Sequence, residues 1–343
     1  MMTPSRLTLA RKRSGLTLAR LGELAELSAR SVSLYENGHS RPSPATLARL
    51  AEVLDVPESF LTGADVEDIP VGAVSFRAVS KMTAQQRDQA LSAGRVALLI
   101  DEWFESRFIL PEPDVPSLTG YDPESAAEVV RARWGMGTRP VPNTLHLAEA
   151  HGTRIYSLTP ENVALDAFSL YWEGRPFVFL STGKSGERGR FDVAHELGHL
   201  VLHGEHQPLH RPDAEVEANR FAAAFLMPRS SVLSAGLRHA DVDTILAAKA
   251  TWKVSALALT HRLAELDLLT EWGYRTACVN LARLGYKSAE PGGIPRESSQ
   301  LLAKVFKALR DGGETLSSVA AAIGISADEL RAHVFGLTLM SVA

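Results

Sequence analysis

The apolar positions at the start of the chain recur with a helical period, and a polar residue stands before most of these runs. Ser, Thr and Asp at such a place accept hydrogen bonds from the first free amides of a helix and mark its start. The helices expected here are Arg6–Ser14, Thr17–Glu26, Ser28–Glu36, Ser43–Leu54 and a short one at Pro57–Leu61. Only Leu27 and its neighbours separate the second helix from the third, which is the spacing of a helix-turn-helix.

The pattern changes after residue 63. Residues 64–86 begin with acidic, Gly and Pro positions and predict a linker or an extended arm. Two amphipathic helices are expected next, at Arg87–Phe108 and Pro123–Trp134. Three short apolar runs bounded by Gly and Pro then indicate a small antiparallel sheet. The expected strands are Thr153–Leu158, Ala167–Trp172 and Arg175–Ser181.

Helical periodicity returns after the predicted sheet. The expected helices are Phe191–His203, the run from 214 to 228, Val242–Ala250, Val254–Leu266, Glu314–Ile323 and Ser326–Phe335. The last four form two pairs with the lengths of further helix-turn-helix units. Few positive charges lie on these pairs, so we expect an interaction or packing role for them rather than DNA binding.

These elements predict an α+β protein in four parts. They are an all-α helix-turn-helix bundle at 1–63, a linker at 64–86, a central domain with the small antiparallel sheet at 87–270, and a helical C-terminal region at 271–343. A length of 343 residues agrees with two or three domains.

The composition, 45% hydrophobic and 22% charged, is that of an ordinary globular protein. No apolar run approaches the roughly 20 residues of a membrane helix, and the N-terminus lacks the apolar core of a signal peptide. We therefore expect a cytoplasmic protein that does not bind membranes. The single cysteine, Cys278, cannot form an internal disulfide and excludes a cysteine-based zinc module.

The net charge of −4 excludes nucleic-acid binding through the overall field of the protein. The first 50 residues differ from the whole, because they hold eight Lys and Arg residues against three Glu residues. This local surplus is where we expect a phosphate backbone to be met.

The sequence His195-Glu196-Leu197-Gly198-His199 carries the clearest chemistry of the chain. Residues four apart on a helix project to the same side, so the two imidazoles can bind one ion. Glu196 beside them is suited to act as general base on a metal-bound water rather than as a ligand. The alternative is an amphipathic helix with two polar histidines at its edge. The apolar surroundings favour the metal site, because buried polar groups need partners.

A catalytic zinc site needs a third protein ligand and an open position. His203 is excluded as that ligand, since three histidines at a spacing of four spread over about 12 Å of helix. We expect His203 to lie at the helix end or to contact a ligand without binding the ion. The carboxylates Glu215 and Glu217 on the next helix are the better donors, and either remains open. Glu215 shares a face with Asn219, whose amide would then hold a ligand histidine by a hydrogen bond.

The predicted strand Arg175–Ser181 stands directly before this helix. In zinc peptidases an edge strand above the site binds the substrate as an additional strand. We therefore predict the sheet beside the metal, with this strand as the edge. The alternative is that the sheet only covers the helix.

The N-terminal segment resembles the DNA-binding domain of the phage repressor and Cro (XRE) family over about 60 residues, through YENGHSRPS and LARLAEVLDV. The resemblance implies that the third helix enters the major groove of operator DNA. The residues expected at the DNA are Thr17, Ala29, Arg30, Ser33, Leu34, Asn37, His39 and Arg41. Arg30 would pair with guanine, and the last three would lie near phosphate. Leu18 departs from the Gln common in that family. A bundle used only for dimerisation or protein binding is the alternative.

The segment AHELGHLVLH, followed by EVEANRFAAAFLMP, resembles the ImmA/IrrE family of metallopeptidases over about residues 75–270. The resemblance implies a zincin-like domain with Zn²⁺, or another divalent ion such as Mn²⁺. His195, His199 and Glu215 would be its ligands and Glu196 its catalytic base, with Asn219 and His203 supporting the ligands. The family cleaves helix-turn-helix repressors and so releases genes of phage induction or stress response.

Together these patterns predict a DNA-binding regulator fused to a zinc endopeptidase. Its expected partners are double-stranded operator DNA and a helix-turn-helix repressor as substrate, and a homodimer is compatible with both. Two alternatives remain from other classes. The peptidase-like domain would act as a metal, ligand or partner sensor without proteolysis, or the chain would be an antitoxin-like repressor of its own operon.

Overall fold

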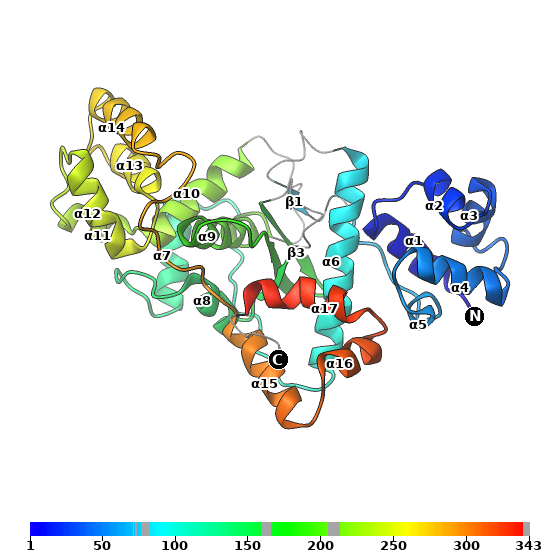
Figure 1. Cartoon of the computed structure of the whole chain (residues 1–343). Helices are drawn as coiled ribbons and strands as arrows, with labels where there is room; N and C mark the ends of the chain where they lie inside the picture. Colours follow the sequence, from blue (N-terminus) through cyan, green and yellow to red (C-terminus); the bar gives the residue numbers. More distant parts are fainter. Residues whose placement is uncertain (71, 73, 77–82, 159–165, 205–212, 339–343) are drawn as a thin grey trace.

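The computed structural model of the chain describes residues 1–70, 72, 74–76, 83–158, 166–204 and 213–338. Over these residues the protein is mostly helical and has one small sheet near its centre (Figure 1). The predicted α+β class is confirmed. Within the same ranges, no helix is both long and apolar enough to cross a membrane.

The N-terminal bundle consists of α1 (Pro4–Arg13), α2 (Leu18–Leu24), α3 (Ala29–Glu36), α4 (Pro44–Val53) and α5 (Glu58–Leu61). The hydroxyl groups of Thr17 and Ser28 cap α2 and α3, as the sequence predicts. Between these helices Glu26 has a φ of 56°, and a Cβ at Gly22 would lie 2.8 Å from the carbonyl oxygen of Leu27. The tight turn between α2 and α3 therefore requires glycine at residue 22.

The 22-residue helix α6 (Ala84–Glu105) lies between this bundle and the sheet (Figure 1). Its Gln85 side chain donates a hydrogen bond to the carbonyl of Gly15 in the bundle. Further along α6, Nε of Arg95 donates to the carbonyl of Glu67 at 3.0 Å. One hydrophobic core continues from α1 across α6 into the sheet. The bundle is thus packed against the rest of the molecule.

The sheet has the strand order β1-β3-β4-β2, from β1 (Ser75–Phe76), β2 (Arg154–Ser157), β3 (Ala167–Trp172) and β4 (Arg175–Leu180). β3 and β4 form an antiparallel hairpin through Glu173 and Gly174, which both have positive φ. β1 also pairs antiparallel, but β2 pairs with β4 in parallel. The prediction of an antiparallel sheet is therefore wrong for β2. A hairpin between β2 and β3 would have been antiparallel. β2 instead pairs with β4 on the side away from β3, and it runs parallel to β4.

The position of β4 corrects a second expectation. The segment Arg175–Ser181 was predicted as the free edge beside the metal, yet β4 has β3 on one side and β2 on the other. Its backbone groups are used in both directions, so no further strand can join it.

Helix α9 (Gly186–Leu202) packs on β3 and β4, and α10 (Ala214–Leu226) packs on α9. A Cβ at Gly198 of α9 would lie 3.2 Å from Cα of Ala218 and 3.1 Å from the Phe221 ring of α10. Glycine at residue 198 therefore permits the close approach of the two helices. A second hydrophobic core joins α9 and α10 to the helices around them. These helices are α7 (Pro123–Arg133), α11 (Arg229–Ser234), α12 (Val242–Trp252), α13 (Ala256–Glu265) and α14 (Glu271–Arg283).

The C-terminal helices lie at the β2 side of the sheet, away from β1 (Figure 1). They are α15 (Gln300–Asp311), α16 (Leu316–Ile323), α17 (Ala327–Val334) and the short 3₁₀ helix η4 (Phe335–Leu337), and α15 contacts α8 (Thr144–Ala150). Hydrogen bonds join α17 to β2, since Ser157 Oγ donates to the carbonyl of Ala332 at 2.6 Å. Glu329 of α17 forms an ion pair with Arg13 of the N-terminal bundle. The C-terminal region thus contacts both the sheet and the bundle.

Candidate metal centre and DNA-facing surface

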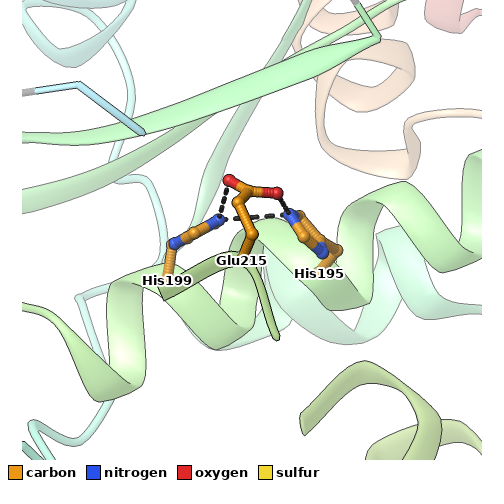
Figure 2. A group of neighbouring side chains, drawn as sticks. All are labelled: His195, His199 and Glu215. Atoms are coloured by element: carbon orange, nitrogen blue, oxygen red, sulfur yellow. Dashed lines mark hydrogen bonds and ion pairs between the residues drawn. The ribbon is translucent and has the colours of Figure 1, made fainter. Parts of the chain in front are cut away.

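Helix α9 brings two histidines together in the interior. His195 and His199 are 1% and 2% exposed, and their Nε2 atoms lie 3.1 Å apart (Figure 2). Their spacing of four residues places them on one face of α9, one turn apart. Two imidazoles with converging nitrogens in an apolar interior can hold one cation.

Glu215 in the first turn of α10 faces this pair (Figure 2). Its two carboxylate oxygens lie 3.4 Å from Nε2 of His195 and 3.3 Å from Nε2 of His199. Two donors bound to one tetrahedral zinc at about 2.0–2.2 Å lie about 3.3–3.5 Å apart. The spacing of the three donors therefore fits a zinc ion. Among the described residues, this is the one group of three His, Cys, Asp or Glu side chains close enough to hold a metal.

The outer nitrogens of the two histidines also have partners. Nδ1 of His195 lies 3.1 Å from Oδ1 of Asn219, which can only accept a hydrogen bond. Nδ1 of His199 lies 3.0 Å from Nδ1 of His203. Nε2 of His203 lies 2.9 Å from a carboxylate oxygen of Glu217, which likewise accepts.

This arrangement defines the tautomers. Asn219 requires a proton on Nδ1 of His195, which leaves the lone pair on Nε2. Glu217 requires a proton on Nε2 of His203, so Nδ1 of His203 accepts from Nδ1 of His199. Nε2 of His199 then also carries a lone pair. Both lone pairs point to the space beside Glu215, as metal ligands need.

The sequence left open whether Glu215 or Glu217 is the third ligand, and the structure places these two carboxylates beside different histidines. Glu215 faces both His195 and His199, whereas Glu217 faces His203. The two residues lie two apart on α10 and therefore project about 200° from each other around the helix. His203 lies behind His199, where the sequence placed it.

Glu196 is 1% exposed and accepts a hydrogen bond of 2.6 Å from Oγ of Ser169 on β3. Burial raises the pKa of Glu196 to about 7, although the charge of His195 and the Ser169 hydrogen bond both oppose the rise. A carboxyl with a pKa near neutrality can both accept and release a proton. Sequence reasoning missed Ser169, whose only distinguishing feature was to be the one serine in the apolar run AFSLYW.

The ionisation of the other groups suits a cation. Burial lowers the pKa of His199 to about 4, so its imidazole is neutral at pH 7. Burial also disfavours the charge on Glu215, but its hydrogen bonds and attraction to His195 and His199 outweigh this and lower its pKa. The centre therefore presents the imidazoles of His195 and His199 and the carboxylate of Glu215, a donor set typical of zinc hydrolases.

Comparisons with known proteins agree with this geometry. A family model described as the IrrE N-terminal-like domain, Peptidase_M78, matches residues 148–264, which hold β2 to β4 and the metal centre. A model described as helix-turn-helix matches residues 7–61. The chain joins a helix-turn-helix domain to an IrrE N-terminal-like domain. Both predicted resemblances are confirmed. A comparison with curated proteins found no match.

The helix-turn-helix domain exposes the face of α3 that was predicted to read DNA. Ala29 and Arg30 are exposed, and Ser33 and Leu34 are half-buried. Asn37, His39 and Arg41 follow in the exposed segment after α3, and Thr17 is exposed at the start of α2. The structure brings these residues to the surface of the same domain. The side-chain amide of Asn37 is partly used, since it donates to the carbonyl of Ser33 at 2.7 Å.

The basic surplus of this domain is smaller than the sequence suggests. Arg6 is buried, and its Nε donates to the carbonyl of Ala64. The other paired cations are Arg11 with Glu36, Lys12 with Asp68, Arg13 with Glu329, Arg20 with Glu23 and Arg49 with Glu26. Arg30 and Arg41 are exposed and form no ion pair within the described part of the chain. The positive charge available to phosphate is therefore concentrated on these two arginines.

Proposed function

We propose that this protein is a DNA-binding regulator whose IrrE N-terminal-like domain is a zinc-dependent endopeptidase. The observation that supports the proposal most is the set of His195, His199 and Glu215, with donors spaced as zinc requires and Glu196 buried beside them. A metal sensor needs such ligands, but it does not need a carboxyl of raised pKa next to them.

In this proposal His195, His199 and Glu215 hold the ion. Bound zinc supplies the polarisation of a water molecule and of a peptide carbonyl. Glu196 accepts a proton from the attacking water and then donates it to the leaving amine. Its pKa of about 7 suits both steps. Ser169 holds the carboxylate of Glu196 in one orientation through its 2.6 Å hydrogen bond.

Asn219 and His203 act as positioning residues in the same proposal. Each keeps one ligand histidine in the tautomer that directs Nε2 to the ion. Two nitrogens and one carboxylate oxygen are donors that zinc prefers. Mn²⁺ is the second candidate, because carboxylate ligands also suit it.

The substrate that we propose is a helix-turn-helix repressor, whose cleavage would release stress or mobile-element genes. The presence of a DNA-binding domain in the same chain supports a substrate in transcriptional control. The proposed functional parts are the ranges 1–63, 64–86, 87–270 and 271–343.

The helix-turn-helix domain supports binding to double-stranded DNA. We propose that α3 enters the major groove, with Arg30 at a guanine and Ala29, Ser33 and Leu34 at neighbouring base edges. Arg41, His39, Asn37 and Thr17 would lie near the phosphates. A homodimer on two half-sites is the expected binding form.

The proposed peptidase is tested with Glu196→Gln, because the amide keeps the shape of the side chain but cannot accept the proton. Zinc-loaded wild type and variant are each incubated with purified helix-turn-helix repressors encoded beside the gene, and cleavage is followed by mass spectrometry. We expect cleavage by the wild type, a loss of at least 100-fold in the variant, and equal zinc content. A wild type that binds stoichiometric zinc and leaves each repressor intact would instead support the sensor function.

A further inference from the structure

β3 touches the candidate metal centre, because Oγ of its Ser169 donates a hydrogen bond to Glu196. β3 pairs with β4 on its inner side, and on its outer side it pairs with β1. The register places Ser75 opposite Ser169 and Phe76 opposite Phe168. β1 belongs to the segment that leads from the helix-turn-helix domain to α6, so a part of the chain far from the peptidase motif covers this edge (Figure 1).

This pairing lies directly beside the proposed catalytic base. Opposed residues of an antiparallel pair have Cα atoms about 5 Å apart. The residue opposite Ser75 is Ser169, and Oγ of Ser169 is hydrogen-bonded to Glu196. The backbone of β1 therefore runs past the strand residue that touches the base.

The other outer edge of the sheet is not available to a peptide. β2 forms that edge, and the hydroxyl and carbonyl groups of its Ser157 both contact α17. Oγ of Ser157 donates to the carbonyl of Ala332 at 2.6 Å, and Nδ1 of His333 lies 3.3 Å from the carbonyl of Ser157. One strand, β4, also separates β2 from β3 and its Ser169.

An extended peptide binds a sheet by adding as a further strand, which requires unpaired backbone groups at an edge. We propose that the β3 edge at Phe168–Ser169 is the strand-addition surface for the peptide substrate, and that Ser75–Phe76 of the same chain occupies it. This inference rests on the proposed peptidase function. A substrate strand then pairs with Phe168 and Ser169 only after β1 has left.

Two features make β1 a replaceable occupant. It pairs through only two residues, whereas a longer peptide can extend along the rest of β3. Its attachment to the chain gives it a high effective concentration at the edge, which disfavours weakly binding peptides. Since β1 follows the helix-turn-helix domain in the chain, a movement of that domain would change the access of substrate.

The test removes the backbone donors of β1 with the double variant Ser75→Pro and Phe76→Pro. Successive residues of a strand direct their N–H groups to opposite sides, so one of the two prolines removes a donor that faces β3. The matched control, Ser75→Thr with Phe76→Tyr, keeps both N–H groups. All proteins carry Glu196→Gln and are loaded with zinc, so that no cleavage occurs. Amide hydrogen exchange is measured over Ala167–Trp172.

We expect the outward amide at Phe168 or Ser169 to exchange at least about tenfold faster in the proline variant than in the parent or the control. A synthetic peptide with the sequence of residues 66–76, added in trans at millimolar concentration, should restore the protection. Unchanged exchange in the proline variant would overturn the occupation by β1. Exchange that accelerates but is not restored by peptide up to its solubility limit would overturn the assignment of the edge as a peptide surface.

These outcomes are independent of catalysis. If the peptidase function fails, no repressor is cleaved by the active protein, yet the exchange at Phe168 and Ser169 still reports the occupation of the edge. If only the inference fails, repressor cleavage persists while the exchange does not respond to the prolines.

Discussion

The metal centre and the DNA-facing surface both place polar side chains on helices, but they prepare them in opposite ways. At the centre, His195 and His199 are buried, and the Nδ1 atom of each has a partner that fixes its tautomer. On the surface, Arg30 and Arg41 are exposed and form no ion pair with described residues. Burial therefore orients the first set before any ligand arrives, whereas DNA itself must order the second. Substitutions should cost far more at the centre.

The same comparison explains why charge counts mislead. Buried groups need partners, so a polar residue in the interior indicates an interaction. Cations of the first 50 residues also pair with carboxylates outside this range, as Lys12 does with Asp68 and Arg13 with Glu329. A surplus counted along the sequence therefore overestimates the charge offered to DNA.

The largest effect is expected at Glu215. Glu215→Ala removes one of three proposed ligands and should weaken zinc binding by at least 100-fold. Asp213→Ala is the matched control, because Asp213 is an exposed carboxylate just before the same helix. Competition with a chromophoric chelator measures both affinities. A Glu215→Ala protein that binds zinc within about threefold of wild type would remove Glu215 from the site.

Glu149, a carboxyl outside the metal centre, provides a second test of the effect of burial. Glu149 is 3% exposed and accepts hydrogen bonds from Ser299 and from the amides of Gln300 and Leu301, at the start of α15. Burial raises its pKa from 4.5 to about 7, against the opposing effect of these bonds. The folded state thus binds more protons than the unfolded state between pH 4.5 and 7. The free energy of unfolding of the protein should therefore fall by about 3 kcal/mol as the pH rises through this window.

Denaturant unfolding of wild type and Glu149→Gln at several pH values measures this contribution. The amide does not titrate, so the difference between the two proteins isolates Glu149 from Asp101, whose pKa burial also raises, to about 6. The stability of the variant relative to wild type should increase from pH 4.5 to 7. Parallel pH profiles would show that Glu149 ionises as freely when folded as when unfolded.

The spacing of residues in the sequence was enough to predict that His195 and His199 lie together. His195 and His199 meet because both lie on one helix, and the helical repeat alone sets their relation. The choice between Glu215 and Glu217 depended on how α10 crosses α9, where the two helices approach closely at Gly198. No local pattern reports such a crossing.

Contacts between distant parts of the chain could not be predicted from the sequence for the same reason. Ser169 reaches Glu196 because β3 packs on α9, and β1 reaches β3 from a segment more than 90 residues earlier in the chain. The parallel pairing of β2 depends on the order of strands in space, which the apolar runs do not encode. The helices that were predicted, their caps and the α+β class follow from periodicity and local hydrogen bonding, whereas α8, α11, α14 and α15 were not predicted individually.

A smaller effect is expected at Glu217, which acts on the ion only through His203 and His199. Glu217→Ala removes the acceptor that fixes the tautomer of His203 and should weaken zinc binding about ten- to 100-fold. Glu217→Gln is the matched control, because its amide oxygen can still accept from Nε2 of His203 and should keep the affinity within about threefold. Equal affinities of wild type and Glu217→Ala would mean that the chain of hydrogen bonds does not orient His199.

The smallest effects should lie on the DNA-facing surface. Arg30→Ala should weaken binding to the DNA upstream of the gene by about 1–2 kcal/mol, or about five- to 30-fold, because an arginine at a base edge contributes about this much. Arg20→Ala is the matched control. Arg20 lies on α2 of the same domain and has the same charge, but it is paired with Glu23 at 2.9 Å and should change the affinity by less than about 0.5 kcal/mol.

Fluorescence anisotropy at two salt concentrations separates the two kinds of contact made by Arg30. A base contact should lower the affinity for the upstream DNA more than that for an unrelated duplex, whereas a phosphate contact lowers both equally and reduces the salt dependence. If Arg20→Ala costs as much as Arg30→Ala, the ion pair with Glu23 does not withhold its charge from DNA. All basic residues on the surface of this domain would then contribute to DNA binding. The metal centre and the DNA-facing surface would differ only in the burial of their side chains.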